Sequence, residues 1–354
     1  MPQGLSKEAR QGLIMVSPAL IYALLLLAVP LLTIIMFSFW TQNFLTINRT
    51  FTLENYTEAL TDPLYRALML RSLRISAWVT TITVILAFPI AYFISFNVRP
   101  EKKALWLFLI TIPFWTSYLI RIFLWRVILA YDGPVNGTLI GLGVIEEPLS
   151  FILYNATAVV ITLAHAFAPF AILPIFVSLE KIDRSLLEAA RDLGEATIMT
   201  FLRVTLPLAM PGVLAAVLIV FIPTVGDYVT PRLVGGSGGT MIANMIYVQI
   251  FDLSNRPMGA TLAVVAMMAV TITLAWAILH IRFWVHLSDG VGGGVRGFVL
   301  AAAAFVIEIS VLRWVLLNGD PYFGPAGTMG VMAAIMVGGA IAIAVLLPKG
   351  RWGI

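Results

Sequence analysis

Long uninterrupted apolar stretches dominate the pattern of hydrophobic and polar positions along the 354 residues. A helix needs about 20 apolar residues to span the hydrocarbon core of a membrane. The stretches that reach this length are residues 13–40, 67–96, 104–129, 151–179, 208–225, 258–281, 297–317 and 326–347. Strands of a transmembrane barrel would instead alternate over about ten residues. The pattern therefore predicts an all-α integral membrane protein with eight spans.

Composition supports the same class of protein. Hydrophobic residues make up 60% of the chain and charged residues 11%, against roughly 45–50% and 25% in soluble proteins. A soluble globule would have too little polar surface, so soluble domains and nucleic-acid binding are excluded. The absence of cysteine excludes disulfides and thiolate metal sites. We predict no metal and no cofactor.

The distribution of Lys and Arg predicts the orientation. If the N-terminus is cytoplasmic, the inner loops hold Lys7, Arg10, Arg99, Lys102, Lys103, Lys181, Arg184, Arg191, Arg203, Arg282, Arg296, Lys349 and Arg351. The outer loops then hold Arg49, Arg66, Arg232 and Arg256. This excess fits the positive-inside rule, and an even number of spans returns the C-terminus to the cytoplasm. The outer loops are acidic, which either concentrates cations or reflects a solvated surface.

The inner loop at residues 180–207 has the pattern of two short helices. An apolar stripe at helical spacing is formed by Leu186, Leu187, Ala190 and Leu193. Asp183 precedes the stripe and is expected to cap the first helix, and Gly194 is expected to end it. A second helix over residues 196–204 is expected to stop before Leu206-Pro207. The loop is therefore predicted to be a helix–turn–helix on the cytoplasmic face.

This loop resembles the characteristic cytoplasmic loop of ABC importer permeases, whose pattern is E-A-A, three residues, G, nine residues, I-x-L-P. Glu188-Ala189-Ala190, Gly194 and Leu206-Pro207 match it, and only Val204 departs, by one methylene. The resemblance implies a type I importer bundle of about six core spans, with two extra C-terminal spans in this chain. It also implies that the loop couples to a separate ATP-binding subunit, with small residues allowing close approach and charges such as Asp192 fixing register.

The chain has no G-x-x-x-x-G-K-[ST] motif. ATP hydrolysis is therefore expected in a partner subunit, and this chain is expected to be a transport subunit rather than an enzyme.

Further segments resemble the spermidine/putrescine branch of these permeases. They are Phe221–Pro231, Leu233–Gly236, Met241–Asn244, Arg99-Pro100 and Pro113–Trp115. The resemblance covers roughly residues 1–285. It implies a second, related permease, an extracytoplasmic binding protein and a place in the bacterial inner membrane. Permeases for ferric iron, phosphonates and opine-type compounds share much of this pattern and remain alternatives.

Asp227 is the leading candidate for the substrate passage. Prolines and glycines break the helical pattern around it, and irregular backbone at membrane depth is tolerated where it lines a cavity or is buried. A carboxylate there would favour an ammonium group, and Tyr228 would add a π-face. The alternative is a structural turn in which Asp227 caps backbone amides.

The third predicted span carries aromatic side chains at helical spacing. One face is expected to hold Trp115, Tyr118, Ile122 and Trp125. Trp115 and Tyr118 are candidates for binding an alkylammonium cation, and core packing or an interfacial belt are the alternatives. Arg121 and Arg126 in this span are expected to snorkel. His165 is expected to be a hydrogen-bonded packing residue.

The predicted organisation is a cytoplasmic segment at residues 1–12, a transport domain at 13–285, and a glycine hinge with two further spans at 286–354. Glu308 and Arg313 lie in or near the seventh span, where charges are functional candidates, although an accessory hairpin is the simpler interpretation. An ion-driven secondary transporter and a membrane-embedded enzyme are competing classes. Neither has a matching set of acidic or catalytic residues.

Overall fold

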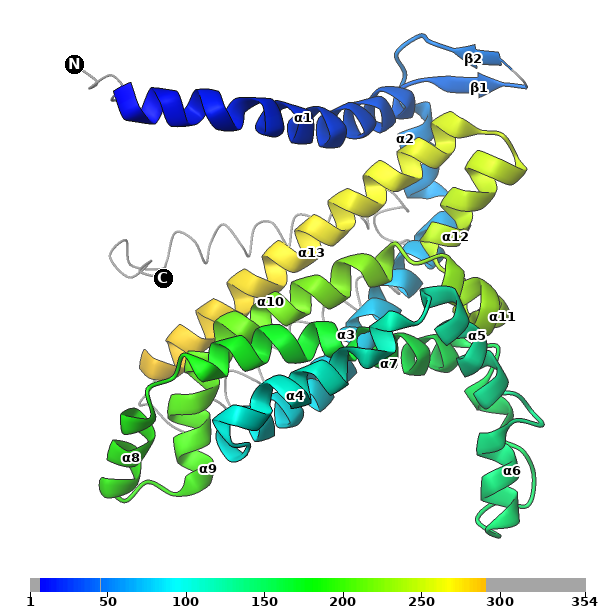
Figure 1. The fold of residues 1–354 in the computed structure, drawn as a ribbon. Helices are drawn as coiled ribbons and strands as arrows, with labels where there is room; N and C mark the ends of the chain where they lie inside the picture. Colours follow the sequence, from blue (N-terminus) through cyan, green and yellow to red (C-terminus); the bar gives the residue numbers. More distant parts are fainter. Residues whose placement is uncertain (1–6, 45, 291–354) are drawn as a thin grey trace. The chain divides into compact units, whose positions relative to one another are not determined.

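A computed structural model describes residues 7–44 and 46–290, and most of these residues are helical (Figure 1). The described residues divide into two compact units, one up to residue 59 with 246–265 and the other 60–245 with 266–290. The two predicted C-terminal spans, with Glu308 and Arg313, lie outside the described residues.

The first unit joins an apolar helix to a small hairpin. Its elements are α1 (Lys7–Ser38), β1 (Thr41–Asn43), β2 (Thr46–Asn48), most of α2 (Glu54–Thr61), η5 (Val248–Asp252) and the start of α13 (Arg256–Gly290). The strands pair antiparallel, with Thr41 opposite Asn48. The Ser38 hydroxyl lies 2.7 Å from the Tyr56 hydroxyl, and Thr261 donates to the Ser38 carbonyl at 3.0 Å. These bonds fix the end of α1 to α2 and to the first part of α13.

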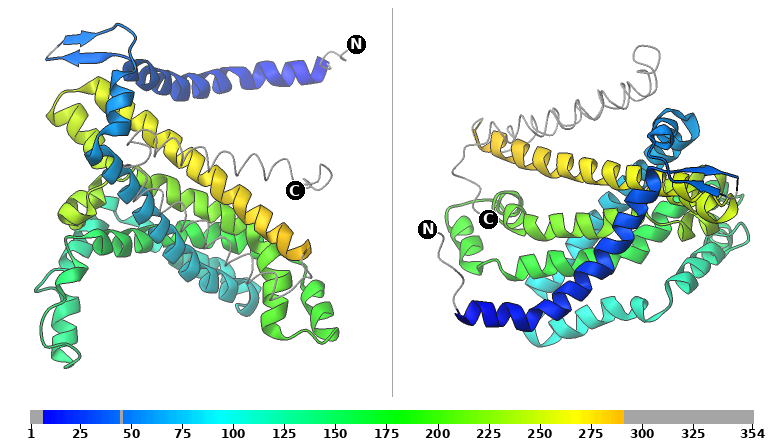
Figure 2. Two further views of the ribbon diagram at one scale, coloured as in Figure 1. Left: turned by 180° about the vertical axis from the view of Figure 1, so that it is seen from behind. Right: turned by 90° about the horizontal axis from the view of Figure 1, so that it is seen from above.

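Three long helices form the core of the second unit. They are α3 (Pro63–Asn97), α7 (Ala156–Glu180) and α10 (Leu206–Val225), and each contacts the other two. Figures 1 and 2 show them running side by side. Buried alanines at the contacts, such as Ala87, Ala171 and Ala216, let the helices approach closely. This packing uses van der Waals contact, because apolar lipid gives no hydrophobic drive for helices to associate.

Apart from the later part of α13, the other elements of this unit are shorter. They are α4 (Pro100–Thr111), η1 (Ile112–Trp115), α5 (Tyr118–Ile128), α6 (Pro134–Gly141), η2 (Ser150–Ile152), α8 (Arg184–Asp192), α9 (Thr197–Thr200), η3 (Phe201–Thr205), η4 (Pro231–Gly235), α11 (Gly236–Gly239) and most of α12 (Ile242–Tyr247). Most of them connect the ends of the long helices, whereas α4 packs against α3 and α7. Both candidate sites combine these shorter segments with residues at the ends of α10.

Within the described residues, five helices are long and apolar enough to cross a membrane, or up to six if the bent pair α4–η1 and α5 is one span. They correspond to the first six predicted stretches. The third stretch is a correction: residues 104–129 do not form one straight helix. The two parts are bent by 85° at residues 116 and 117. Pro113 opens the short η1 turn, and Thr116 has an extended backbone, which ends the helix before α5 begins.

A second correction concerns residues 196–204. The helix does not stop before Leu206-Pro207 but continues from α9 through the π-helical turn η3 into α10. The Leu206 amide bonds the carbonyl of Phe201, five residues earlier. A wider π turn relieves the clash between a proline ring and the carbonyl four residues before it. Pro207 is therefore accommodated in the first turn of α10.

Gly212 marks the tightest approach between α7 and α10. A Cβ atom added there would lie 2.5 Å from the Pro174 carbonyl oxygen and 2.5 Å from the Ser178 Cβ. No side chain fits without moving the two backbones apart. The glycine therefore sets the distance between these helices.

We predict that Gly212→Ala lowers stability by about 1–3 kcal/mol, the usual range for overpacking. Gly137→Ala in α6 is the control, because its added Cβ would meet nothing within 4 Å. The measurement is the apparent Tm of the detergent-solubilised protein. Equal Tm values for the two variants would contradict the close α7–α10 packing.

Candidate functional site

The loop between α7 and α10 folds as the two short helices α8 and α9, at one end of the long helices (Figure 1). The carboxylate of Asp183 accepts the Ser185 amide at 3.0 Å, which confirms the predicted cap. This hydrogen bond lowers the pKa of the Asp183 carboxyl below its ordinary value, because it stabilises the charged form. The cap strengthens the start of α8 as long as Asp183 is ionised.

Gly194 ends α8 as predicted, at φ +82°. The Gly194 amide bonds the Arg191 carbonyl at 2.9 Å, and the Glu195 amide bonds the Ala190 carbonyl at 3.0 Å. These two bonds form a Schellman motif, which requires a left-handed residue at the position of Gly194. The glycine of the loop pattern therefore has a conformational role.

The loop residues of the sequence pattern fall on different faces. Glu188, Ala189 and Asp192 are exposed on α8. Ala190, however, is only 9% exposed, together with the neighbouring Leu187. The side of α8 that carries them faces the loop's own second half, because α8 contacts α9 and η3. Ala190 thus packs inside the loop, which differs from the expected approach of a partner to both alanines.

Leu206 and Pro207 open α10 rather than closing a separate helix. They join the loop to a core helix without a break, which the sequence pattern did not predict.

The opposite end of α10 carries the second candidate site. α10 ends at Val225, and Asp227 follows it with only 9% of its surface exposed. Its Oδ1 accepts the amides of Val229 and Thr230 at 2.9 and 3.3 Å. These are the hydrogen bonds expected if Asp227 forms a structural turn. Asp227 caps the helical segment that leads into η4.

The other oxygen of Asp227 faces α5. The hydroxyl of Tyr118 donates to Asp227 Oδ2 at 2.7 Å and lies 3.0 Å from the Thr230 hydroxyl. Two predicted passage residues, 109 positions apart in the sequence, are thus brought into direct contact. Thr230 was not predicted.

Tyr228 is 41% exposed beside this cluster. Its carbonyl accepts the side-chain amide of Asn244 at 2.7 Å, and the Asn244 oxygen accepts the Met241 amide at 3.0 Å. Asn244 was part of a segment that resembled the permease branch, but no role was predicted for it. It holds the irregular chain between α10 and α12 in place.

Trp115 does not join the cluster. It lies in η1, before the bend, and is 77% exposed, so the predicted single face of Trp115 and Tyr118 is wrong. Ile122 is fully buried and Trp125 half-buried on α5. Trp125 donates to Nδ1 of His165 at 3.1 Å, which confirms the hydrogen bond predicted for His165.

The two arginines of α5 have defined neighbours. The guanidinium of Arg121 lies 5.1 Å from the centre of the Phe114 ring, and Arg126 donates to the Tyr154 hydroxyl at 3.4 Å. Arg126 therefore reaches the following loop. Arg121 lies on α5, as Tyr118 does, and contacts the Phe114 ring across the bend, so its charge opposes a cation near Tyr118.

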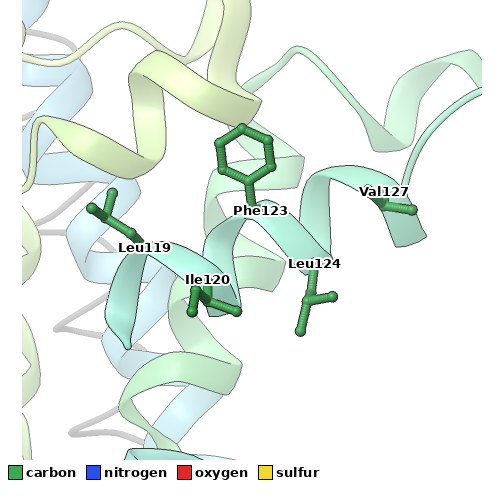
Figure 3. Close-up of a pocket in the computed structure, with 5 residues that line it drawn as sticks. All are labelled: Leu119, Ile120, Phe123, Leu124 and Val127. Atoms are coloured by element: carbon green, nitrogen blue, oxygen red, sulfur yellow. The ribbon is translucent and has the colours of Figure 1, made fainter. Parts of the chain in front are cut away.

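A shallow hollow on α5 is entirely apolar. Its lining residues, shown in Figure 3, are Leu119, Ile120, Phe123, Leu124 and Val127. All of them come from one helix, and each is exposed. With no polar atom in its lining, the hollow suits a lipid chain or another apolar helix rather than a charged solute.

Fold and loop together define the membrane-spanning permease of a binding-protein-dependent importer. The chain belongs to the family described as binding-protein-dependent transport system inner membrane component, which matches residues 74–282. The protein is accordingly a multi-pass inner-membrane protein and a permease subunit of an ABC importer.

Two relatives show which importer permeases the chain is similar to. The chain is 36% identical over 264 residues to the spermidine/putrescine transport system permease protein PotB of Escherichia coli, covering 74% of this chain and 93% of the relative. It is 34% identical over 260 residues to the inner membrane ABC transporter permease protein YdcU of the same organism, covering 70% and 82%.

The fold is similar to that of a bacterial alginate ABC transporter solved in complex with an alginate pentasaccharide-bound periplasmic protein. The TM-score is 0.58 at 16% identity, covering 83% of this chain and 100% of that chain. At this identity the similarity concerns the fold alone.

We predict that Gly194→Ala weakens the end of α8 by about 1–2 kcal/mol, because a side chain disfavours the left-handed conformation. The added Cβ would meet nothing within 4 Å, so the effect is conformational. Gly194→Asn is the matched control, since asparagine tolerates this region. Amide hydrogen exchange over residues 184–195 measures the change. Equal exchange in Gly194→Ala and wild type would contradict the Schellman geometry.

Proposed function

We propose that this chain is one of two permease subunits of an ATP-driven importer of polyamines such as spermidine and putrescine. The assignment of a polyamine as the substrate rests on the buried Asp227 carboxylate at the end of α10, which is hydrogen-bonded to Tyr118. The name of the E. coli relative, which shares 36% identity over most of its length, points to the same solutes.

The negative charge of Asp227 favours a cation, whereas the charge of Arg121 on α5 opposes one. Among the described residues, the Asp227 oxygens are bonded by neutral polar groups, namely the Tyr118 hydroxyl and the amides of Val229 and Thr230. No salt bridge to Asp227 occurs in the described residues. Its negative charge is therefore stabilised by dipoles but not neutralised by a contacting cation. A passing ammonium group would gain a charge-assisted hydrogen bond there.

Aromatic side chains extend the proposed passage. Tyr228 is half exposed beside Asp227, and Trp115 is exposed at the bend before α5. Their rings would attract alkylammonium groups through cation–π contacts of about 0.5–2 kcal/mol. Contacts of this strength suit a passage, where a solute must bind and leave.

The loop supplies the docking face for a separate ATP-binding subunit. Its exposed surface carries Glu188, Ala189 and Asp192, with Leu193 at 85% and Ile198 at 71% exposure. Exposed leucine and isoleucine on a polar loop are typical of a protein contact. We place this loop and both chain termini in the cytoplasm, in accord with the positive-inside rule.

A second permease and an extracytoplasmic binding protein complete the assembly. One chain supplies only one wall of a passage, and the apolar outer face of α5 would be covered by lipid or by that second permease. The alginate transporter of similar fold was solved in complex with a periplasmic protein, which supports delivery of solute by such a partner. Ferric iron, phosphonate and opine-type solutes are the competing substrates.

We predict that Asp227→Asn lowers spermidine uptake at least about tenfold, because a hydrogen bond to a charged group contributes about 1.5–3 kcal/mol. The asparagine keeps an oxygen for the Val229 amide, so the cap survives. Uptake is measured in proteoliposomes that hold the complete importer.

The matched control is Thr230→Val, which removes a neighbouring hydroxyl without changing the charge. Uptake by Asp227→Asn equal to that of Thr230→Val would contradict a role for the carboxylate charge in the passage.

We also predict that Glu188→Arg reduces co-purification of the ATP-binding subunit and removes ATP-dependent uptake. The reversed charge lies on the exposed face of α8. An arginine there would repel a basic group of the partner that pairs with Glu188, and like charges at an interface cost several kcal/mol. Arg49→Glu in the hairpin of the first unit is the control for a charge reversal away from the loop. Normal co-purification with Glu188→Arg would contradict docking at this face.

A further inference from the structure

Both ends of the loop at residues 180–207 are attached to the same helix, α3. At its start, Glu180 and Arg184 contact Ser95 of α3, and at its end, Phe201 contacts the rings of Phe88 and Tyr92. Ser95 lies 85 or more positions from its loop partners in sequence. The loop is thus joined to α3 by contacts that do not run along the chain.

The carboxylate of Glu180 binds side chains from three other elements. Its Oε1 accepts the Ser95 hydroxyl of α3 at 2.6 Å, the Lys103 ammonium of α4 at 2.7 Å and the Arg184 guanidinium of α8 at 3.4 Å. Glu180 itself is the last residue of α7. We call Ser95, Lys103, Glu180 and Arg184 the Glu180 cluster.

Partial burial makes the cluster more than a surface ion pair. The side chains of Lys103, Glu180 and Arg184 are 16%, 32% and 41% exposed, respectively. Ser95 is buried. Exposed pairs contribute little because water screens them, whereas several charges held in a shielded network with fixed hydrogen bonds keep a defined geometry.

Arg184 holds the first turn of α8 against α3. Its Nη2 donates to the Ser95 carbonyl at 3.0 Å and lies 3.3 Å from the Ser95 hydroxyl. Its guanidinium carbon lies 3.8 Å from the centre of the Phe96 ring. The planar group is therefore fixed both by stacking and by hydrogen bonds, which a lysine would not reproduce.

An aromatic contact holds the other end of the loop. Phe201 in η3 meets Phe88 edge-on at a centroid distance of 5.5 Å and Tyr92 at 6.1 Å. Tyr92 stacks on Phe96 at 4.5 Å. Phe88, Tyr92 and Phe96 are four residues apart and share one face of α3. One stripe of α3 therefore receives both ends of the loop.

We propose that the Glu180 cluster and Phe201 are positioning residues that deliver a displacement of the loop to α3. The inference rests on the proposed docking of the loop to an ATP-binding subunit. A loop tied only to the chain ends of α7 and α10 would pivot when a partner moves it. A loop clamped to α3 at both ends moves that helix with it, so that ATP hydrolysis and the movement of the core helices stay coupled.

The ion pair between Arg203 and Glu195 differs from the Glu180 cluster because it does not involve α3. It joins η3 to the turn after α8, so both partners lie within the loop. It stiffens the loop but does not connect the loop to α3. Only the Glu180 cluster and the Phe201 contact make that connection among the loop contacts described above.

The test measures the coupling ratio, that is, solute imported per ATP hydrolysed. The complete importer is reconstituted in proteoliposomes with its binding protein, and labelled spermidine uptake and phosphate release are followed in the same samples. Glu180→Gln removes the charge but keeps the size of the side chain. We expect its ratio to fall at least about threefold, in the range that coupling residues usually show, with assembly intact.

Lys103→Met and Lys102→Met form a matched pair. Lys102 is the neighbouring lysine of α4 and is not a partner of Glu180, so we expect the ratio to fall in Lys103→Met only. If Glu180→Gln does not assemble, Ser95→Ala and Lys103→Met decide the question by the same ratio.

An unchanged coupling ratio in the cluster variants would overturn the proposal. A proportional fall in both uptake and ATP hydrolysis counts as an unchanged ratio. Failure of the proposed function has a different signature: the wild-type importer would then show no ATP-dependent uptake of spermidine.

Discussion

The close packing of α7 against α10 is the constraint on which both candidate sites depend. Gly212 allows the two backbones to approach until an added Cβ would strike the Pro174 carbonyl. The loop at residues 180–207 joins one end of this helix pair, and the Asp227 segment follows the opposite end of α10. Because close-packed interiors move in discrete steps rather than deforming smoothly, a push at the loop would reach the other end as a movement of whole helices.

The two sites use polar groups in different ways. At the loop, charged side chains from separate elements meet on Glu180 and fix relative positions. At the passage, the carboxylate of Asp227 is held by neutral donors, and the described residues form no salt bridge with it. In our proposals, the first arrangement transmits position, and the second leaves a negative charge available to a cationic solute. In the proposed importer these are the two roles required of one permease subunit.

Local features of the sequence predicted local features of the structure. Run length predicted the first six membrane-spanning stretches, because the thickness of the bilayer fixes the length of an apolar helix. The Asp183 cap and the Gly194 stop followed from side-chain chemistry and were confirmed. The bend at residues 116 and 117 was not predicted, because hydropathy carries no information on direction. The continuous helix through Pro207 was missed because a π turn offsets the usual effect of proline.

Contacts between distant segments could not be predicted in the same way. The hydrogen bond between Tyr118 and Asp227 joins residues 109 positions apart, although each was a candidate by itself. Glu180, Ser95 and Phe201 have no unusual local pattern, so their importance appears only when α3, α7 and the loop are packed together. Ala190 was assigned to a partner contact from its small size, whereas its burial depends on how α8 folds onto α9 and η3.

The most direct test of the proposed function is uptake of labelled spermidine by proteoliposomes that contain this chain, its ATP-binding subunit, a second permease and the binding protein. Ferric chelates and phosphonates are supplied as competitors. We predict uptake that requires ATP and the binding protein and that putrescine inhibits while the other solutes do not. ATP-driven uptake of a competitor, with spermidine and putrescine inert, would contradict the assignment of a polyamine as the substrate.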